Sequence, residues 1–194
     1  MGTVYFRCSE GIPITSPKVN YAGAWEDLKH IIEYVNKKYV TDPETGKKKT
    51  SLYAFGCSLG ALILGLYAGY DADKASEILD GIVLYATPWN TREGWKSFRE
   101  NFFGLYSWVI GTKLSMDVRD KILPEMKSML TQEDYRAYKE GLETNNKGLV
   151  GLDELVYVRM FGYKDVWQYY DYVTVSDQVT KIKVPTFALG ASDD

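Results

Sequence analysis

The stretch from residue 51 to residue 70 constrains the fold more than any other part of the sequence. Residues 51–55 form an apolar-rich run with the composition of a short strand. This run leads directly into Gly56-Cys57-Ser58-Leu59-Gly60, and the apolar segment LILGLYAGY then continues as a helix. Because the chain must reverse sharply between strand and helix, the stretch predicts a strand–turn–helix unit of a parallel sheet.

Other segments of the chain extend this pattern. Residues 3–6, residues 78–86 and the run TFALGA near the end of the chain are strand candidates, since each is short and nearly continuously apolar. The recurrence of Trp25, Leu28, Ile32, Val35 and Tyr39 at intervals of three or four residues predicts a helix over 24–39. The alternation of strands and helices indicates the α/β class with a mostly parallel sheet.

The region from about residue 89 to residue 165 is helix-rich, with helices expected over 117–130 and 132–142. We expect it to form a helical cap, inserted between strands of one partial sheet domain that spans residues 1–194. Its apolar residues predict ordinary cap packing, and an acyl-chain pocket or a membrane-facing lid is the less favoured alternative. These residues are Trp95, Phe98, Phe102, Phe103, Leu105, Tyr106, Trp108, Val109 and Ile110. Packing is also the favoured role of Tyr169, Tyr170 and Tyr172.

Composition excludes several classes of protein. The 23 basic and 26 acidic residues give a net charge of −3, which offers no electrostatic reason to expect nucleic acid as a partner. No apolar run reaches the ~20 residues that cross a bilayer, and the start of the chain lacks the features of a signal peptide. With only Cys8 and Cys57, the chain is not a disulfide scaffold. We therefore expect a cytoplasmic or membrane-associated protein rather than a secreted one. The sequence contains no metal-ligand cluster, phosphate-binding glycine loop or dinucleotide fingerprint, so we expect no metal and no cofactor.

The turn Gly56-Cys57-Ser58-Leu59-Gly60 has the Gly-x-Ser-x-Gly pattern of a nucleophile elbow, in the required context between a strand and a helix. The strained turn would hold the Ser58 hydroxyl at the carboxyl end of the sheet, while Gly56 and Gly60 leave room for neighbouring backbone. The backbone N–H of Leu59 would supply half of an oxyanion hole. The alternative is a small-residue turn that only packs a helix against a sheet.

Such a serine needs a base and an acid, and the sequence contains a single histidine, His30. His30 precedes the elbow, lies within the expected helix over 24–39 and stands off its apolar stripe, so it is expected to be a partly exposed surface residue. Asp193 and Asp194 close the last strand candidate, which suits the acid. The alternative for these two residues is a solvated acidic loop end.

Four stretches resemble one subfamily of the α/β-hydrolases, which includes YheT-like hydrolases, plant embryogenesis-associated proteins and related animal lipases and phospholipases. They are VYFRCSEGIPITSPKVNYAG, AFGCSLGALILGLYAG, LDELVYVRMFGYKDVWQYYDYVTVSD and IKVPTFALGASDD. The loop of the first stretch departs from the family, since Ser9-Glu10-Gly11 stands where Arg-Gly is usual. The match extends over nearly the whole chain.

The resemblance implies a serine ester hydrolase of the lipase or esterase type, acting on a small ester or a lipid. Carried over to this sequence, Ser58 is the nucleophile and Asp193 is the acid, with Asp194 as the second choice. The family's histidine would lie beyond Asp194, and its first strands, second oxyanion donor and any membrane anchor would lie before Met1. The chain therefore resembles an internal piece of a larger hydrolase and is expected to be nearly inactive alone. The alternatives are a truncated inactive fragment or a non-catalytic binding or interaction protein with the same fold.

Overall fold

The computed structural model describes residues 1–9 and 11–191, and only the backbone of residues 98, 99, 101 and 102. The chain divides into two compact units. The first, called the sheet unit below, consists of Ala22–Gly94 and Tyr172–Asp194. The second, called the helical unit, consists of Met1–Tyr21 and Trp95–Asp171.

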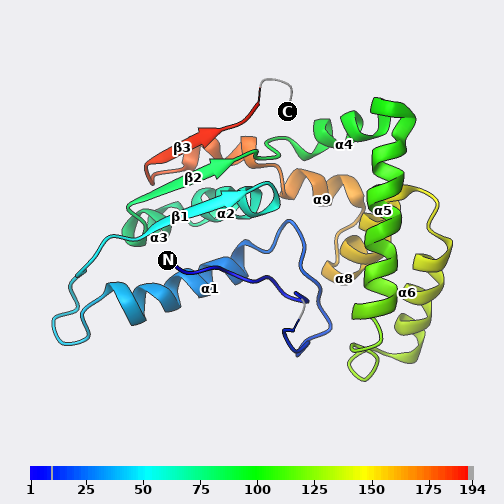
Figure 1. Ribbon diagram of the computed structural model, residues 1–194, viewed down its shortest axis with the longest axis horizontal. Coiled ribbons are helices and arrows are strands. Elements are labelled where there is room, and N and C mark those ends of the chain that lie inside the picture. The colour runs from blue at the N-terminus through cyan, green and yellow to red at the C-terminus, as the bar shows by residue number, and fades with distance from the viewer. Residues whose placement is uncertain (10, 192–194) are drawn as a thin grey trace. The chain divides into compact units, whose positions relative to one another are not determined.

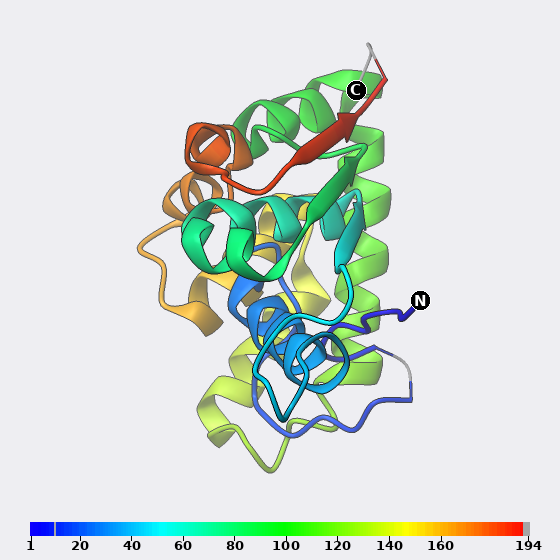
Figure 2. The same cartoon turned by 90° about the vertical axis from the view of Figure 1, so that its left-hand side faces the viewer.

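The sheet unit is built on three parallel strands, β1 (Tyr53–Cys57), β2 (Gly81–Tyr85) and β3 (Thr186–Leu189). They lie in the order β1-β2-β3, and Figures 1 and 2 show their arrows side by side and pointing the same way. The ends of the strands are in register, because Cys57 pairs with Tyr85 and Tyr85 pairs with Leu189. The predicted parallel sheet of the α/β class is confirmed.

Five helical segments belong to the same unit: α1 (Trp25–Val35), η1 (Asn36–Val40), α2 (Leu59–Tyr70), α3 (Ala72–Ile78) and η5 (Val175–Lys181). Helix α2 is buried along its whole middle, from Ala61 to Gly69, as expected for a helix that is apolar on every side. Ile82 and Leu84 of β2 pack in the same cluster as Leu64 and Tyr67 of α2. This cluster is the core that holds the sheet unit together.

Only one face of the sheet is covered by this core. The side chains on the opposite face are large, apolar and exposed; they are Tyr53, Phe55, Tyr85, Phe187 and Leu189. Nearly continuously apolar strands of a parallel sheet are usually buried on both faces. The structure shows that apolar composition alone does not bury them, because α2 packs against a single face.

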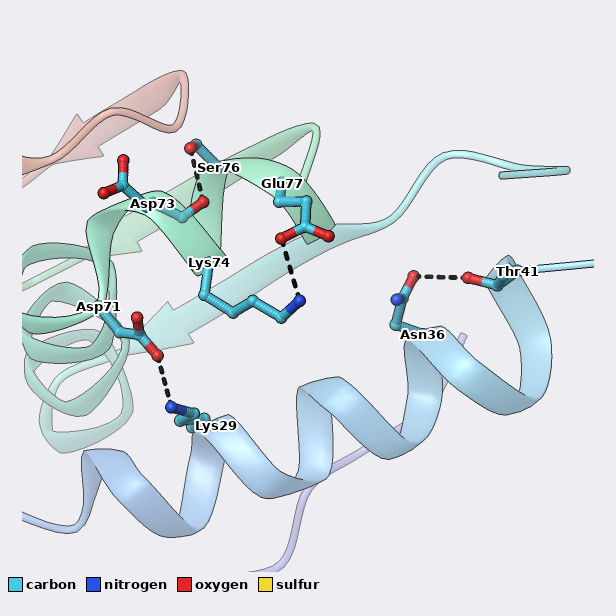
Figure 3. A network of polar contacts seen from close by, with 8 residues as sticks. All are labelled: Lys29, Asn36, Thr41, Asp71, Asp73, Lys74, Ser76 and Glu77. Carbon is cyan, nitrogen blue, oxygen red and sulfur yellow. Dashed lines mark hydrogen bonds and ion pairs between the residues drawn. The ribbon is translucent and has the colours of Figure 1, made fainter. Parts of the chain in front are cut away.

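The end of the predicted helix over 24–39 differs from expectation. Its last turn, η1, is a π-helix, in which the Thr41 N–H donates to the Asn36 carbonyl over five residues at 2.8 Å. A hydroxyl contact between Thr41 and the Asn36 side chain closes the same turn (Figure 3). Because the wider turn rotates the following side chains, Val40 is 2% exposed, whereas the predicted core residue Tyr39 is 55% exposed.

The helical unit contains η2 (Asn101–Gly104), α5 (Leu105–Asp117), η3 (Val118–Ile122), α6 (Gln132–Thr144), α7 (Gly148–Leu152), η4 (Asp153–Val158) and α8 (Arg159–Phe161). Two further helices, α4 (Thr91–Glu100) and α9 (Val166–Tyr172), contain residues of both units. Its core includes Leu123, Met126, Tyr138, Leu152 and Val156. The expectation of a helix-rich region is confirmed.

Two local predictions in this unit are wrong. The helix expected over 117–130 ends at Ile122, because Pro124 has no N–H with which to continue the helical hydrogen bonds. The strand expected over 3–6 is an exposed segment without strand structure. A four-residue apolar run forms a strand only where a neighbouring strand pairs with it, and among the described residues β1–β3 pair only with one another.

Candidate functional site

Ser58 lies at the reversal between β1 and α2, in a strained backbone conformation. Its φ of 51° and ψ of −118° fall outside the regions that residues with a side chain usually occupy. Two hydrogen bonds hold this conformation: the Ser58 N–H donates to the Tyr85 carbonyl at 2.9 Å, and the Ser58 carbonyl accepts from the Leu62 N–H at 3.0 Å. The exposed Ser58 is therefore fixed at the carboxyl end of the sheet by β2 and α2.

The two glycines of the turn differ in what they do. A Cβ atom on Gly56 would lie 2.6 Å from the Ala61 Cα and from the Gly60 carbonyl oxygen, so the turn closes only without a side chain there. A Cβ atom on Gly60 would meet no atom within 4 Å. The expectation that both glycines make room for neighbouring backbone is thus confirmed for Gly56 and wrong for Gly60.

The backbone around Ser58 offers a site for negative charge. Leu59 is the first residue of α2, so its N–H has no carbonyl partner within the helix. The positive end of the helix dipole lies at the same place. A developing oxyanion beside Ser58 would be stabilised by both, which is the role expected of the Leu59 N–H.

The end of β2 contributes a neighbouring feature that the sequence did not reveal. Ala86 has a φ of 49°, and its N–H donates to the Leu189 carbonyl of β3 at 2.8 Å. The next residue, Thr87, is buried, and its hydroxyl has no hydrogen-bond partner among the described residues. Because Cys57 and Tyr85 are paired, these two residues stand beside the Ser58 turn. The sequence Ala-Thr-Pro carries no signal for such a conformation.

The single histidine is exposed, as expected. His30 lies on α1, its side chain is 75% exposed, and its Nδ1 is 3.9 Å from a carboxylate oxygen of Glu33 on the same helix. The preceding residue, Lys29, forms a 2.7 Å ion pair with Asp71, which ties α1 to the end of α2 (Figure 3). His30 therefore has the surroundings of a surface residue.

The candidate acids, Asp193 and Asp194, lie outside the described residues. The last described strand, β3, ends at Leu189 in register with Tyr85. The chain thus leaves β3 at the same edge of the sheet at which Ser58 leaves β1.

The aromatic candidates of the helical region fall into two groups. Tyr169 and Tyr170 are buried, and Tyr172 accepts a 2.8 Å hydrogen bond from the Trp25 indole, so the packing role is confirmed. Trp95 is half-buried against Trp167. The packing prediction is wrong for six residues that are exposed: Phe103, Leu105, Tyr106, Trp108, Val109 and Ile110. The side chains of Phe98 and Phe102 lie outside the described ones.

The surface hollows of the described residues belong to a different unit from the Ser58 turn. Of the two described surface hollows, one is lined by residues that include Arg119, Tyr135 and Lys139, and the other by residues that include Cys8 and Ile12. Both belong to the helical unit, whereas Ser58 belongs to the sheet unit. Within residues 1–9 and 11–191 no three His, Cys, Asp or Glu side chains are grouped as metal ligands.

Two known proteins are similar to this chain. One is the monoacylglycerol lipase of Saccharomyces cerevisiae, which is 25% identical over 187 residues, covering 93% of this chain and 38% of that protein. The other is the protein abhd-3.2 of Caenorhabditis elegans, 23% identical over 184 residues, covering 95% of this chain and 44% of that protein. The chain thus spans less than half the length of each relative.

No family model matches the chain. No solved structure matches it either. Both relatives are α/β hydrolases, and the sheet of this chain has the parallel arrangement expected for that fold. The relatives and the parallel sheet together bear out the superfamily expected from the sequence, and the chain has a partial α/β-hydrolase-type fold.

Proposed function

We propose that this chain carries the nucleophile of a serine ester hydrolase of the lipase or esterase type. The observation that carries the proposal is the strained conformation of Ser58, which hydrogen bonds to β2 and α2 hold at the carboxyl end of β1. The name of the yeast relative, a monoacylglycerol lipase, supports an ester of a lipid as the substrate class. In this proposal residues 89–165 are the helical insertion of one hydrolase domain.

The proposed chemistry is acyl transfer. The Ser58 hydroxyl attacks the ester carbonyl and passes its proton to a histidine, the Leu59 N–H stabilises the oxyanion, and the alcohol leaves. Water then hydrolyses the acyl-serine. Asp193 would orient the histidine and stabilise its charged form.

His30 is not assigned the role of the base, because it is exposed and paired with Glu33. The base would then come from outside the 194 residues, so the chain alone should acylate slowly and turn over poorly. The alternative is that no base is ever supplied, in which case the protein is a non-catalytic binding protein with the same fold.

Acylation with an activated ester separates these two functions. The chain is incubated with p-nitrophenyl acetate, with and without imidazole to stand in for the base, and the acetylated residues are mapped by mass spectrometry. The Cys57→Ser background is used, because the exposed Cys57 thiol next to Ser58 would itself be acetylated. We expect Ser58 to be acetylated about a hundredfold faster than Ser51, an exposed serine outside the turn.

The control is the Ser58→Ala variant in the same background, in which the fast acetylation should disappear while that of Ser51 is unchanged. Imidazole should accelerate the reaction at Ser58 more than at Ser51. Equal rates at Ser58 and Ser51 in both conditions would contradict a nucleophilic Ser58 and favour the binding protein.

A further inference from the structure

Positive charge is concentrated in one segment of the sheet unit, which lies between α1 and β1 and is called the basic hairpin below. This segment, residues 37–49, contains five lysines and two acidic residues, a net charge of +3. Because the whole chain carries −3, the other residues carry −6 between them. The basic hairpin is therefore a local positive region on an otherwise negative protein, which is a feature of surfaces that bind anions.

Backbone hydrogen bonds hold the basic hairpin in a defined conformation. The Lys49 N–H donates to the Val40 carbonyl at 2.8 Å, and the Asp42 N–H donates to the Lys47 carbonyl at 2.8 Å. At the tip, the Asp42 carboxylate accepts from the N–H of Thr45 at 2.8 Å and from its hydroxyl at 3.0 Å. These bonds are the main reason that the pKa of Asp42 is lowered, and the charge of Lys49 contributes less. One of the two acidic groups is thus used to brace the loop.

Three lysines of this region are exposed and available to a partner. Lys48 is not one of them, since it forms a 2.6 Å ion pair with Asp80 and donates to a carbonyl at the end of α3 at 2.9 Å. Successive side chains of an extended segment point to opposite sides, so Lys47 and Lys49 face away from this anchor. Neither of them, nor Lys37 on η1, forms an ion pair within the part of the chain that the structure describes.

Two exposed tyrosine rings lie beside these lysines. The Lys38 ammonium donates to the Tyr34 hydroxyl at 2.7 Å and lies 5.2 Å from the ring centroids of both Tyr34 and Tyr39. Each tyrosine is 55% exposed. The ammonium lies over one face of each ring and is attracted to it. The surface therefore combines positive charge with apolar area, which suits a partner that carries apolar side chains among its acidic ones.

The small size of the basic hairpin and its acidic surroundings indicate the kind of anion that it fits. A long polyanion such as a nucleic acid would reach past the hairpin onto residues with a net charge of −6, and like charges across an interface disfavour binding. A short acidic segment of a protein carries only a few carboxylates, which the exposed lysines can pair. The charge distribution thus favours the short polypeptide segment.

We propose that the basic hairpin binds a short acidic segment of a partner protein. Lys37, Lys47 and Lys49 would pair with its carboxylates, and Tyr34 and Tyr39 would contact its apolar side chains. The hairpin leads into the start of β1, whereas the serine turn follows the end of that strand (Figure 1). The inference therefore does not depend on the proposed hydrolase.

Fluorescence anisotropy tests this inference on the 194-residue chain, with a fluorescein-labelled peptide of eight glutamates around one phenylalanine as the probe. We expect binding at low ionic strength that weakens as sodium chloride is added. The variant Lys37→Gln/Lys47→Gln/Lys49→Gln should bind at least about tenfold more weakly, a loss equal to about 1.4 kcal/mol. The corresponding triple arginine variant keeps the charge and should bind as the original chain does.

The matched control is Lys121→Gln/Lys139→Gln/Lys147→Gln, which changes the net charge equally in the helical unit. These lysines are paired with carboxylates, so probe binding should stay within about twofold of the original. The inference is overturned if the probe does not bind at low ionic strength, or if both glutamine variants weaken binding equally. It is also overturned if an octathymidylate binds more tightly than the peptide through the same lysines, since the site would then be one for nucleic acid.

A second measurement needs no variant and keeps the test valid if a substitution disturbs folding. A carbodiimide joins the carboxylates of the bound peptide to lysine amines that they contact, and mass spectrometry of the digested chain locates the links. We expect the links at Lys37, Lys47 and Lys49. Links spread evenly over exposed lysines such as Lys127 and Lys164 would contradict a site at the basic hairpin.

Discussion

The Gly56→Ala chain is expected to lose at least about 3 kcal/mol of its free energy of unfolding, a large fraction of the about 5–15 kcal/mol that ordinary domains have. The added Cβ atom would lie 2.6 Å from the Ala61 Cα and the Gly60 carbonyl oxygen, and 2.7 Å from the Ala61 N. These are backbone atoms of the first turn of α2, which cannot move without displacing a helix that is buried from Ala61 to Gly69. Denaturant unfolding followed by circular dichroism measures the loss.

The Gly60→Ala variant is the matched control within the same motif. Its Cβ atom would meet nothing within 4 Å, and Gly60 has no positive φ. Since alanine is a better helix former than glycine by ~1 kcal/mol, this variant should be unchanged or slightly more stable. Equal losses in the two variants would show that the turn packs differently from the structure described above.

The stability of the whole chain is expected to fall as the pH rises from 5 to 8, and Asp153 is the reason. Its carboxylate accepts a 2.5 Å hydrogen bond from the hydroxyl of Tyr170, a buried residue whose ring packs edge-to-face against Trp167, and Glu154 is its charged neighbour. Loss of hydration on burial raises the pKa of Asp153 to about 7, and the nearby Glu154 adds to this, while the Tyr170 hydrogen bond opposes it.

The raised pKa of Asp153 determines the direction in which stability changes with pH. Between the ordinary pKa of 3.8 and about 7, the folded state keeps a proton on Asp153 that the unfolded state has released. Raising the pH through this window therefore destabilises the fold, by about 2–4 kcal/mol in total. Above about pH 7 the effect should level off.

The Asp153→Asn variant should remove this dependence, because the amide keeps the shape and still accepts from Tyr170 without titrating. The free energy of unfolding of each protein, measured from pH 5 to pH 8, tests this. Asp134→Asn serves as the control: hydrogen bonds from Thr131 and Arg159 lower the pKa of the exposed Asp134, so its contribution changes only below pH 4. If the Asp153→Asn variant keeps the pH dependence of stability, another titrating group is responsible for that dependence.

Several elements could be predicted because their signals are local. The predicted helix over 132–142 is present as α6, where the Thr131 hydroxyl accepts from the Asp134 N–H at 3.0 Å. The turn at Ser58 was predictable for the same reason. Glycine and serine allow the chain to reverse sharply, and the apolar runs on either side show where the reversal lies. The exposure of His30 followed from its position off the apolar stripe of α1.

Other features depend on contacts between distant residues and have no local signal. The inward face of α5 is set by its close approach to Gly148 of α7, far along the chain from Gly111, so that apolar residues expected in the core are exposed. The positive φ of Ala86 is set by hydrogen bonding to β3, a hundred positions further along the chain.

The sequence by itself determined the α/β class, the parallel sheet and the place of the serine turn, because the periodicity of apolar residues and the turn-forming residues act over a few neighbouring positions. Only the tertiary structure decided which faces of the sheet and of α5 are covered, and which glycine of the turn is needed. These depend on how closely two segments approach, and that distance is set by the packing of side chains far apart in the sequence.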